Sequence, residues 1–548
     1  MAEQQKGKRD FQVDQQSGFC KANGIYYSKR EPVLLPPPHH PLDVITYIFS
    51  LQHNMQQIAF IDGPSGTTLT YSALRLKVRA LAAGLHGLGI RKGDVVLVIS
   101  SNSIALPCIH LAILSIGAIL TTANPLSTER EIVTQVKDSK PVIAFTLSHL
   151  IHKLRATQIP IILIQGTLES RCVTTLHDLL QSDLKDMPSI DIKQDDTATL
   201  LYSSGTTGKS KGVVSTHGNY IATIAGNRVR YETEGCKMYI CSMPLFHIYG
   251  LRFLVCTLAA GATIVVPPKF DMEEILRSIE RYRVTLLPTV PSVLAALAKS
   301  TGAQKYDLGS LQQISLGGAP LGKDVTLTFN AKFPRIQIRQ GYGLTETTGA
   351  IAYTNSDEEN RRNGTVGLLS DVVEAKVVDP DSAKPLPPNQ RGELWLRGPT
   401  VMKGYFGNEH ATATTLDSEG WLRTGDLCYF DEEGFLFVVD RLKDLIKYKA
   451  YQVAPAELEE LLLSHPEISE AAVIPYPDQE AGQIPMAFVA RSPSSNLSES
   501  DVIKFVAEQV VHYKKIRRVA FTNSIPKNAS GKILRKDLIE KNVPTSRL

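Results

Sequence analysis

Ser203-Ser204-Gly205-Thr206-Thr207-Gly208-Lys209-Ser210-Lys211-Gly212 is the most informative stretch of this sequence, because it combines flexible backbone, hydroxyls and cations in one short loop. Glycine lets main-chain N–H groups approach an anion closely, hydroxyls donate hydrogen bonds, and lysine supplies a mobile positive charge. The apolar run before the loop, Thr197 to Tyr202, predicts a buried strand. We therefore expect a phosphate-binding loop at the carboxyl end of a strand in an α/β sheet.

Gly208-Lys209-Ser210 resembles the end of a Walker A loop, but that motif requires glycine at the position that Ser203 occupies. The P-loop interpretation is therefore excluded. The alternative is a solvent-exposed turn, which is how most clusters of Gly, Ser and Thr are used. The density of glycine, lysine and hydroxyls in this loop favours nucleotide binding over a plain turn.

The composition is that of an ordinary globular protein that is too long for one core. The chain has 548 residues, with 59 Lys+Arg against 55 Asp+Glu, so its charge of +4 argues against nucleic acid as a partner. Seven cysteines without a metal-type pair, and no signal peptide ahead of them, indicate a reducing compartment and argue against disulfides and zinc. The most membrane-like stretch, Ile104 to Leu120, is interrupted by polar residues and proline, so we expect a buried helix and no membrane span.

Apolar strand-like runs alternate with helical periodicity along most of the chain, which predicts an α/β fold. Asp271 to Arg283 is the clearest predicted helix, and short strands replace the alternation from about residue 390. We predict an extended N-terminal arm (1–40), a large N-terminal domain (41–440) and a small mobile α+β domain (441–548) with its hinge near Lys443. The large domain is expected to contain layered α/β subdomains plus a β-barrel-like part.

Four further segments follow the phosphate loop: Gln340 to Glu346, Trp421 to Asp426, Asp440 to Gln452, and Pro526 to Lys532. In this order the motifs resemble the adenylate-forming superfamily of acyl-CoA synthetases, luciferases and peptide-synthetase adenylation domains. The resemblance runs from about residue 45 to the end of the chain. Pro244 to Gly250 and Ile446 to Lys449 most resemble the plant 4-coumarate CoA ligase and ligase-like branch, which includes peroxisomal enzymes.

The resemblance implies ATP, CoA and Mg²⁺ as cofactors, since a carboxylate becomes electrophilic when it is activated as an acyl-AMP. It assigns catalysis to Lys532, Lys447, His247 and Glu346. Glu346 and Thr206 are the implied metal ligands. The implied ATP- and AMP-binding residues are Ser203, Ser204, Gly205, Thr206, Thr207, Gly208, Lys211, Gln340, Gly341, Tyr342, Thr345, Asp426, Arg441, Lys447, Gln452 and Lys532.

The resemblance also implies a CoA site and an acyl pocket. The implied CoA-binding residues are Lys269, Lys449 and Ala450, and the implied acyl-pocket residues are Tyr249, Gly318, Ala319, Gly341, Gly343 and Tyr353. His247 corresponds to a gate of that pocket. Taken singly, surface lysines are more often solvated than bound to a ligand, and a lone histidine is more often structural.

Three departures from the family pattern bear on the substrate. Ala450 replaces a usual glycine, which leads to the hypothesis of a slowed thioester step. Tyr353 stands where hydroxycinnamate ligases commonly carry methionine, and its bulk would shorten the pocket. Leu316 stands where the family often has serine, and an apolar wall there would favour a less hydroxylated acid, either cinnamate-like or alicyclic and fatty.

We therefore predict an ATP-dependent carboxylic acid CoA ligase whose substrate is a cinnamate- or 4-coumarate-like aromatic acid. Alternatives are a medium-chain or jasmonate-precursor fatty acyl-CoA ligase, a luciferase-type monooxygenase, and an acyl-adenylate-binding or carrier-loading module. The final tripeptide, Ser546-Arg547-Leu548, approximates a peroxisomal address, so an import receptor is an expected partner and the peroxisome an expected location. If no import receptor recognises the tripeptide, we expect a cytoplasmic protein.

Overall fold

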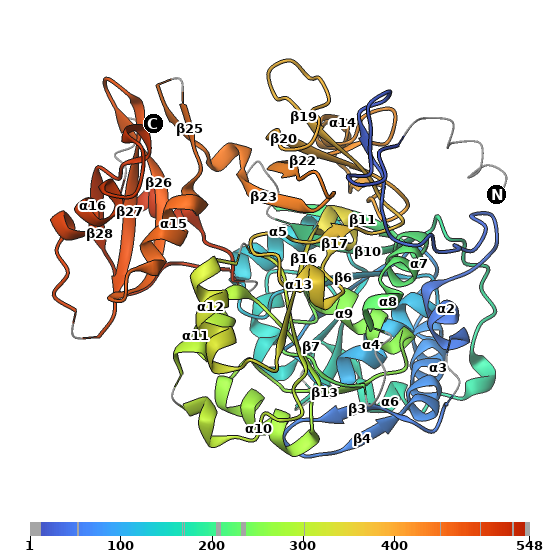
Figure 1. The fold of residues 1–548 in the computed structure, drawn as a ribbon. Helices are drawn as coiled ribbons and strands as arrows, with labels where there is room; N and C mark the ends of the chain where they lie inside the picture. The colour runs from blue at the N-terminus through green and yellow to red at the C-terminus, as the bar shows by residue number, and fades with distance from the viewer. Residues whose placement is uncertain are drawn as a thin grey trace.

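The computed structural model describes residues 13–51, 54–166, 168, 170–203, 210–231, 237–300, 302–319, 321–449, 451–493, 495–528 and 531–542. Within these residues the chain forms two large mixed sheets, a six-stranded sheet and a five-stranded sheet. The fold is α/β, with a large N-terminal domain and a small C-terminal domain. Figure 1 shows the C-terminal residues, in orange and red, as a separate unit beside the rest of the molecule.

The first large sheet carries the phosphate-loop hairpin. Its core strands are parallel, and the hairpin adds to one side as an antiparallel pair. The strand order is β21 (Gly404–Tyr405), β11 (Lys211–Thr216), β10 (Thr197–Ser203), β6 (Ile119–Ala123), β5 (Val95–Ile99), β7 (Ile143–Leu147), β8 (Ile161–Gln165) and β9 (Cys172–Thr175).

The second large sheet is also parallel at its centre and antiparallel at its edges. The strand order is β18 (Leu368–Leu369), β17 (Gly349–Tyr353), β16 (Gln337–Leu344), β15 (Gln313–Leu316), β14 (Leu286–Thr289), β12 (Met238–Ile240), β13 (Thr263–Val266), β3 (Ile58–Asp62) and β4 (Thr68–Thr70).

Helices cover the two large sheets and supply most of the apolar contacts between them. Their shared core extends from Val44 to Leu286 in the sequence. The helices of the large domain are α2 (Val44–Ser50), α3 (Tyr71–Gly87), α4 (Ala105–Ser115), α5 (Glu129–Ser139), α6 (Leu176–Leu179), α7 (His217–Gly226), α8 (Arg228–Tyr231), α9 (Ile248–Ala259), α10 (Met272–Tyr282), α11 (Pro291–Lys299), α12 (Lys323–Lys332), α13 (Asp357–Asn360) and α14 (Glu409–Thr415).

The six-stranded sheet is antiparallel and open, so the predicted β-barrel-like part does not close into a barrel among the described residues. Its two edge strands are β1 and β23, and no pairing joins them. The strand order is β1 (Phe19–Cys20), β2 (Ile25–Tyr26), β19 (Glu374–Val378), β20 (Gly392–Arg397), β22 (Leu422–Phe430) and β23 (Leu436–Arg441).

The predicted N-terminal arm is partly wrong. Residues 1–12 lie outside the described part, but Phe19–Tyr26 forms a hairpin that pairs with β19. The Tyr26 ring is 1% exposed and stacks on Phe430 with their centroids 4.2 Å apart. The proline run at 36–38 suggested an extended chain over the whole segment, whereas the apolar residues before it are buried in the sheet.

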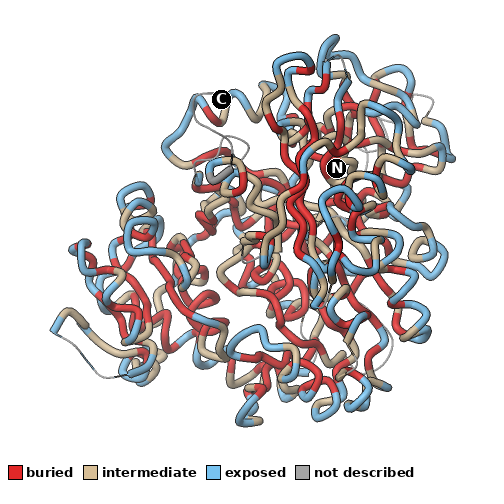
Figure 2. Tube along the Cα trace, turned by 90° about the vertical axis from the view of Figure 1, so that its left-hand side faces the viewer, coloured by how far each residue is buried: buried red, intermediate tan, exposed pale blue. Residues whose placement is uncertain are grey.

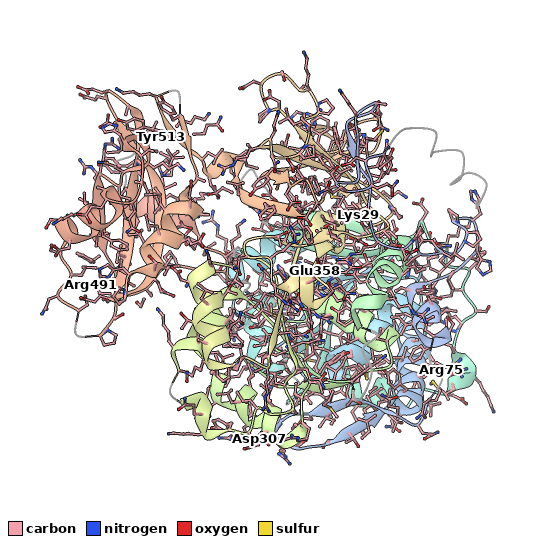
Figure 3. The ribbon with its side chains drawn as sticks, viewed as in Figure 1. Lys29, Arg75, Asp307, Glu358, Arg491 and Tyr513 are labelled. Atoms are coloured by element: carbon pink, nitrogen blue, oxygen red, sulfur yellow. The ribbon has the colours of Figure 1, made fainter. Side chains whose placement is uncertain are left out.

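The small domain has its own sheet and core. Its strands are β25 (Tyr451–Val453), β24 (Ile446–Tyr448), β27 (Gly482–Arg491), β26 (Ile468–Asp478) and β28 (Arg518–Phe521), and its helices are α15 (Pro455–Ser464), α16 (Glu499–Ala507) and α17 (Arg535–Asn542). The buried apolar side chains of this core all fall between Ile446 and Leu538. Figure 2 shows buried segments inside both units and exposed loops around them, and Figure 3 places Arg491 and Tyr513 on the small unit, away from Arg75 and Asp307.

Predicted local elements agree with the structure where their capping signals are clear. The predicted helix at 271–283 is α10, which begins after Asp271, whose side chain accepts from Glu274 N–H. The apolar spacing of Val502, Val506, Val510 and Tyr513 suits one continuous helix over 501–513, but α16 ends at Ala507 and is followed by a 3₁₀ turn at His512–Lys514. The spacing is misleading because Val510 and Tyr513 pack on the same core although neither belongs to α16. Among the described residues, none of the helices combines the length and apolar character that a bilayer crossing requires.

Candidate active site

The phosphate loop joins two antiparallel strands, β10 and β11, and does not lead into a helix. Ser203 ends β10, and its hydroxyl donates to Glu346 Oε1 over 2.7 Å. Lys211 begins β11, and its Nζ lies 4.7 Å from the centroid of the Tyr405 ring. The hairpin therefore places the Ser203 hydroxyl on one side of the loop and the Lys211 ammonium group on the other. The loop residues Ser204, Gly205, Thr206, Thr207 and Gly208 lie outside the described residues.

Glu346 is an oxygen ligand suited to a hard cation. It lies in a short 3₁₀ turn, Thr345–Thr347, that follows β16, and it is 9% exposed. Oε1 accepts from the Ser203 hydroxyl and, over 3.0 Å, from the Tyr405 hydroxyl, whereas Oε2 accepts from no described residue. Mg²⁺ commonly binds one or two carboxylates together with substrate phosphates, which this arrangement can provide. No cluster of three or more His, Cys, Asp or Glu ligands occurs among the described residues.

Tyr342, Asp426 and Arg441 meet where the second large sheet approaches the six-stranded sheet. Asp426 is 3% exposed, and one carboxylate oxygen accepts from the Tyr342 hydroxyl over 2.5 Å. Arg441 Nε lies 3.5 Å from the other oxygen. Burial raises the pKa of Asp426, and Arg441, the Tyr342 hydrogen bond and Lys532 act against that increase. A carboxylate held in this way can accept hydrogen bonds from a pair of ribose hydroxyls.

Lys532 comes from the small domain and reaches this same cluster. Its loop is held by Asn528, whose side-chain oxygen accepts from Lys532 N–H over 2.9 Å. Gly531 has φ of +79°, and a Cβ added there would lie 3.1 Å from the Val290 side chain of the large domain. The loop therefore contacts the large domain through a residue without a side chain.

The charge on Lys532 is sensitive to its surroundings. Burial lowers the pKa of Lys532 from its ordinary value of 10.5 to about 8, and the positive charges of Arg441 and Lys443 act in the same direction. Asp426 and Asp444 raise this pKa by a smaller amount. The lysine thus lies in an electropositive place that an added anion would neutralise.

His247 and Tyr249 begin helix α9 beside the predicted acyl pocket. His247 is the N-cap, and its Nδ1 accepts from Tyr249 N–H over 3.2 Å, so the ring proton belongs on Nε2. Burial lowers the pKa of His247 to about 4, which leaves the imidazole neutral at neutral pH. The Tyr249 hydroxyl donates to the Ser315 carbonyl over 2.9 Å. His247 is therefore held as a neutral group at the start of the helix.

The other predicted acyl-pocket residues come from the ends of β15, β16 and β17. Gly318 and Ala319 follow β15, and Gly341 pairs with Tyr353 across β16 and β17, with Gly343 further along β16. Tyr353 is 1% exposed, and its hydroxyl donates to the Gly226 carbonyl over 2.7 Å. The Gly317 backbone lies between two of these groups, since a Cβ there would lie 3.4 Å from the Gly341 carbonyl and 3.5 Å from the Tyr249 ring.

The apolar wall expected from Leu316 is wrong. Leu316 belongs to the core under α10, α11 and α12. Because side chains alternate along a strand, the neighbouring Ser315 faces the opposite way and accepts from Arg230 over 2.6 Å. The surface near Tyr249 is therefore more polar than the sequence suggested.

The remaining predicted residues fall into two groups. Gln340 and Thr345 flank the Gly341–Leu344 segment in or directly after β16, next to the residues described above. Lys447, Lys449 and Gln452 are exposed on the β24–β25 hairpin, where Lys447 pairs with Gln452, and Lys269 is exposed between β13 and α10. None of these four has a recorded contact with Asp426 or Glu346. Ala450, at the tip of the hairpin, lies outside the described residues.

Sequence reasoning missed two residues at the site. Tyr405 donates to Glu346 and lies beneath Lys211, but it comes from β21, an edge strand with no motif of its own. Arg230 is 2% exposed and lies against Gly341, but it belongs to none of the motifs. Neither residue carried a spacing signal that would have identified it.

Comparisons with known proteins match this geometry. The profile of the AMP-binding enzyme family matches residues 50–406, and that of the AMP-binding enzyme C-terminal domain matches residues 457–532. The probable CoA ligase CCL5 of Humulus lupulus is 56% identical over 98% of each chain. Peroxisomal OPC-8:0-CoA ligase 1 of Arabidopsis thaliana is 53% identical over 98% of this chain and 100% of its own. The o-succinylbenzoate coenzyme A synthetase of Bacillus subtilis, in complex with ATP and magnesium ion, has a TM-score of 0.78 at 29% identity, over 90% of this chain and 98% of its own.

Proposed function

The chain belongs to the AMP-binding enzyme family, and from that premise we propose that it is an AMP-forming acid–thiol ligase. The acid's carboxylate attacks the α-phosphorus of ATP, so that acyl-AMP forms and pyrophosphate leaves. The thiolate of CoA then attacks the acyl carbon, and AMP leaves as the thioester forms. ATP, CoA and a carboxylic acid are the small-molecule substrates.

Some residues of the site bind and position the nucleotide, and others supply the charge that the reaction needs. Lys211 and the loop 203–208 bind the outer phosphates, and Thr345 and Gln340 lie beside the α-phosphate. Asp426 accepts hydrogen bonds from the ribose hydroxyls, with Arg441 beside it. Lys532 holds its positive charge at the reacting phosphorus, where negative charge is highest in the transition state. Glu346 and Thr206 would hold Mg²⁺, and the ion would screen the phosphate charges.

The observation that carries this proposal is the position of Lys532, a residue of the small domain that lies beside the buried Asp426 of the large domain. Burial of this cation at the domain boundary is only partly offset by Asp426 and Asp444, so a bound anion would stabilise it further. An acyl-AMP and its parent ATP supply that anion. The resemblance to known ligases and the geometry of the described residues thus agree.

The proposal is tested by measuring AMP release from ATP with a panel of acids, with and without CoA. We expect release to require one class of acid and to be strongly stimulated by CoA. Release that is independent of CoA, or light emission with oxygen, would favour the carrier-loading or luciferase-type alternatives. No AMP release with any acid would overturn the proposal.

For the second half-reaction we propose that the small domain rotates about a hinge near Lys443, with domains at 41–440 and 441–548. The rotation withdraws Lys532 and brings Lys447, Gln452, Lys449 and Ala450 towards the acyl-AMP, with Lys269 as a further CoA contact. His247 gates the acyl pocket.

For the acid substrate we propose a chemical class and no single compound. The acyl pocket takes either a cinnamate-like aromatic acid or a fatty acid related to jasmonate precursors, and the similarity to an OPC-8:0-CoA ligase supports the second. That relative is a peroxisomal enzyme, which supports a peroxisomal location for this chain. We propose Ser546-Arg547-Leu548, which lies outside the described residues, as the address. A fluorescent fusion that stays in peroxisomes after removal of this tripeptide would contradict its role as the address.

A further inference from the structure

Three buried arginines lie together next to the acyl pocket, and none of them forms an ion pair within the described part of the chain. Arg230, Arg252 and Arg339 are 2%, 3% and 8% exposed. Each donates only to neutral oxygens of the described residues. Burying a charge without a partner of opposite sign is costly, so an acceptor that binds beside such a group is favoured.

Two of the three arginines are held by neutral protein groups. Arg252 donates to Asn227 Oδ1 and to the Tyr231 hydroxyl, each over 3.3 Å. Arg339 donates to the Arg230 carbonyl over 3.3 Å and to Asn355 Oδ1 over 3.4 Å. Their guanidinium groups are thus directed at side chains and backbone that surround the pocket.

Arg230 differs because its guanidinium lies against Gly341, a predicted acyl-pocket residue. Its Nη2 donates to Ser315 Oγ over 2.6 Å, while Nη1 donates to no described residue. A Cβ placed on Gly341 would lie only 2.8 Å from Nη1, so this nitrogen lies against the backbone of Gly341. The ring of Tyr353 lies 5.4 Å from the guanidinium carbon.

The neighbours of Arg230 connect it to the acyl pocket. Ser315 accepts from Arg230 through its hydroxyl and from the Tyr249 hydroxyl through its carbonyl. A Cβ at Gly317 would lie 3.4 Å from the Gly341 carbonyl and 3.5 Å from the Tyr249 ring. One wall of the proposed acyl pocket is therefore formed by Arg230, Gly341, Ser315 and Tyr249.

We propose that Arg230 is a specificity-determining residue that binds an oxygen acceptor, oxo or carboxylate, on the part of the acid distant from its reacting carboxyl group. This inference rests on the proposed function, because it assumes that the acid occupies the surface formed by Tyr249 and Gly341. A guanidinium presents several N–H donors in one plane and binds such oxygens strongly. An acid with a plain hydrocarbon end would leave Nη1 desolvated and without an acceptor.

The first test uses the unmodified enzyme and pairs of acids matched in length. Each set contains a monocarboxylic acid, its counterpart with an oxo group near the far end, and its counterpart with a second carboxyl group, in straight-chain and aromatic forms. We expect kcat/KM for CoA-dependent AMP release to be on the order of 10- to 100-fold higher for an oxygen-bearing member, as expected for a hydrogen bond from a charged donor. The oxo and carboxyl members show which acceptor is preferred.

The second test uses Arg230→Gln and Arg230→Lys, with Arg252→Gln as the matched control. Each change alters one buried arginine of the same cluster, but Arg252 packs against Gly349 and does not approach Gly341. We expect the preference for the oxygen-bearing acid to fall towards one in Arg230→Gln, to be partly kept in Arg230→Lys, and to be kept in Arg252→Gln. Thermal unfolding of each variant shows whether it is folded.

The outcomes separate the two proposals. If the unmodified enzyme uses no acid, the proposed function is wrong. If it uses acids but gives equal kcat/KM for matched members, or if Arg230→Gln retains the preference, the inference about Arg230 is wrong while the ligase function stands. If Arg230→Gln does not fold, the comparison of matched acids on the unmodified enzyme still decides the question.

Discussion

Replacing Lys532 with alanine tests the central step of the proposed mechanism. The pKa of Lys532, lowered from 10.5 to about 8 by burial and by neighbouring cations, means that its charged form is disfavoured by roughly 3 kcal/mol before nucleotide binds. With a pKa of about 8 the lysine is still mostly charged at neutral pH, and phosphate oxygens beside it would favour the charged form further. Independently of that shift, removing one positioned donor from a developing charge is expected to slow the step by about 100-fold, which corresponds to roughly 3 kcal/mol.

The assay separates the two half-reactions. Lys532→Ala is expected to slow acyl-AMP formation, followed as pyrophosphate exchange into ATP, by about 100-fold or more. Conversion of supplied acyl-AMP to the thioester should change little, because that step does not need the charge at the phosphorus. Lys527→Ala is the matched control: it lies on the same loop but pairs with Glu470 of the small domain over 2.5 Å. If Lys532→Ala forms acyl-AMP at the unmodified rate, the reasoning is refuted.

The same lysine predicts a pH dependence. Since the pKa of Lys532 in the free enzyme is lowered to about 8, its charged fraction falls as the pH rises through that value. The parameter kcat/KM for ATP, which reports the free enzyme, should therefore fall above about pH 8. Lys532→Arg keeps its charge and should move this decrease to higher pH. A profile that is identical in the two enzymes would assign the decrease to another group.

Two further changes probe the nucleotide and CoA sites. Asp426→Asn removes the buried carboxylate beside Tyr342 and should raise KM for ATP by roughly 10-fold or more, because a charged acceptor for the ribose is lost. An unchanged KM would mean that the ribose lies elsewhere. The control is Asp431→Asn, which changes a turn residue of the same sheet. Ala450→Gly should speed the consumption of preformed acyl-AMP by CoA, because it removes a methyl group from the proposed passage. An unchanged single-turnover rate would reject that hypothesis.

The order of motifs was enough to predict the reaction and the fold class, because each motif is a short local pattern. The strand Thr197 to Tyr202, the loop after it and the helix at Asp271 to Arg283 all depend on neighbouring residues, and the structure confirms the strand and the helix. The pairing of Phe19–Tyr26 with β19 was not predicted, since it joins segments that are far apart in the sequence. Composition alone could not show that Tyr26 stacks on Phe430.

The site was predictable only where a motif carried it. Asp426, Tyr342 and Lys532 were each assigned by resemblance, and the structure brings them together. Tyr405 and Arg230 escaped because one is on an edge strand without a motif and the other belongs to none of the motifs. For Leu316, the register of β15 decided the outcome: one position along the strand separates the core from the surface that faces Arg230.

Helix α12 provides a contact that exists only while the small domain is in its present position. Its N-cap residue, Gly322, has no side chain to satisfy the first N–H groups of the helix. Glu460, on α15 of the small domain, accepts from Lys323 N–H over 2.8 Å and so caps the helix from the other domain. Figure 1 shows α15 lying near α12. A carboxylate at a helix N-terminus contributes about 1 kcal/mol.

Glu460→Ala should therefore weaken the present arrangement, in which Lys532 lies beside Asp426, relative to the rotated one. We expect acyl-AMP formation to slow by about fivefold, with no loss in the thioester step, since about 1 kcal/mol corresponds to that factor. Glu457→Ala is the matched control, because Glu457 lies on the same helix but pairs with Lys514 of its own domain over 2.6 Å. Equal slowing of both half-reactions in Glu460→Ala, or the same shift in Glu457→Ala, would show that the contact does not select between the two positions. A selective effect would tie the adenylation step to one carboxylate at the domain boundary, because no other part of the chemistry involves Glu460.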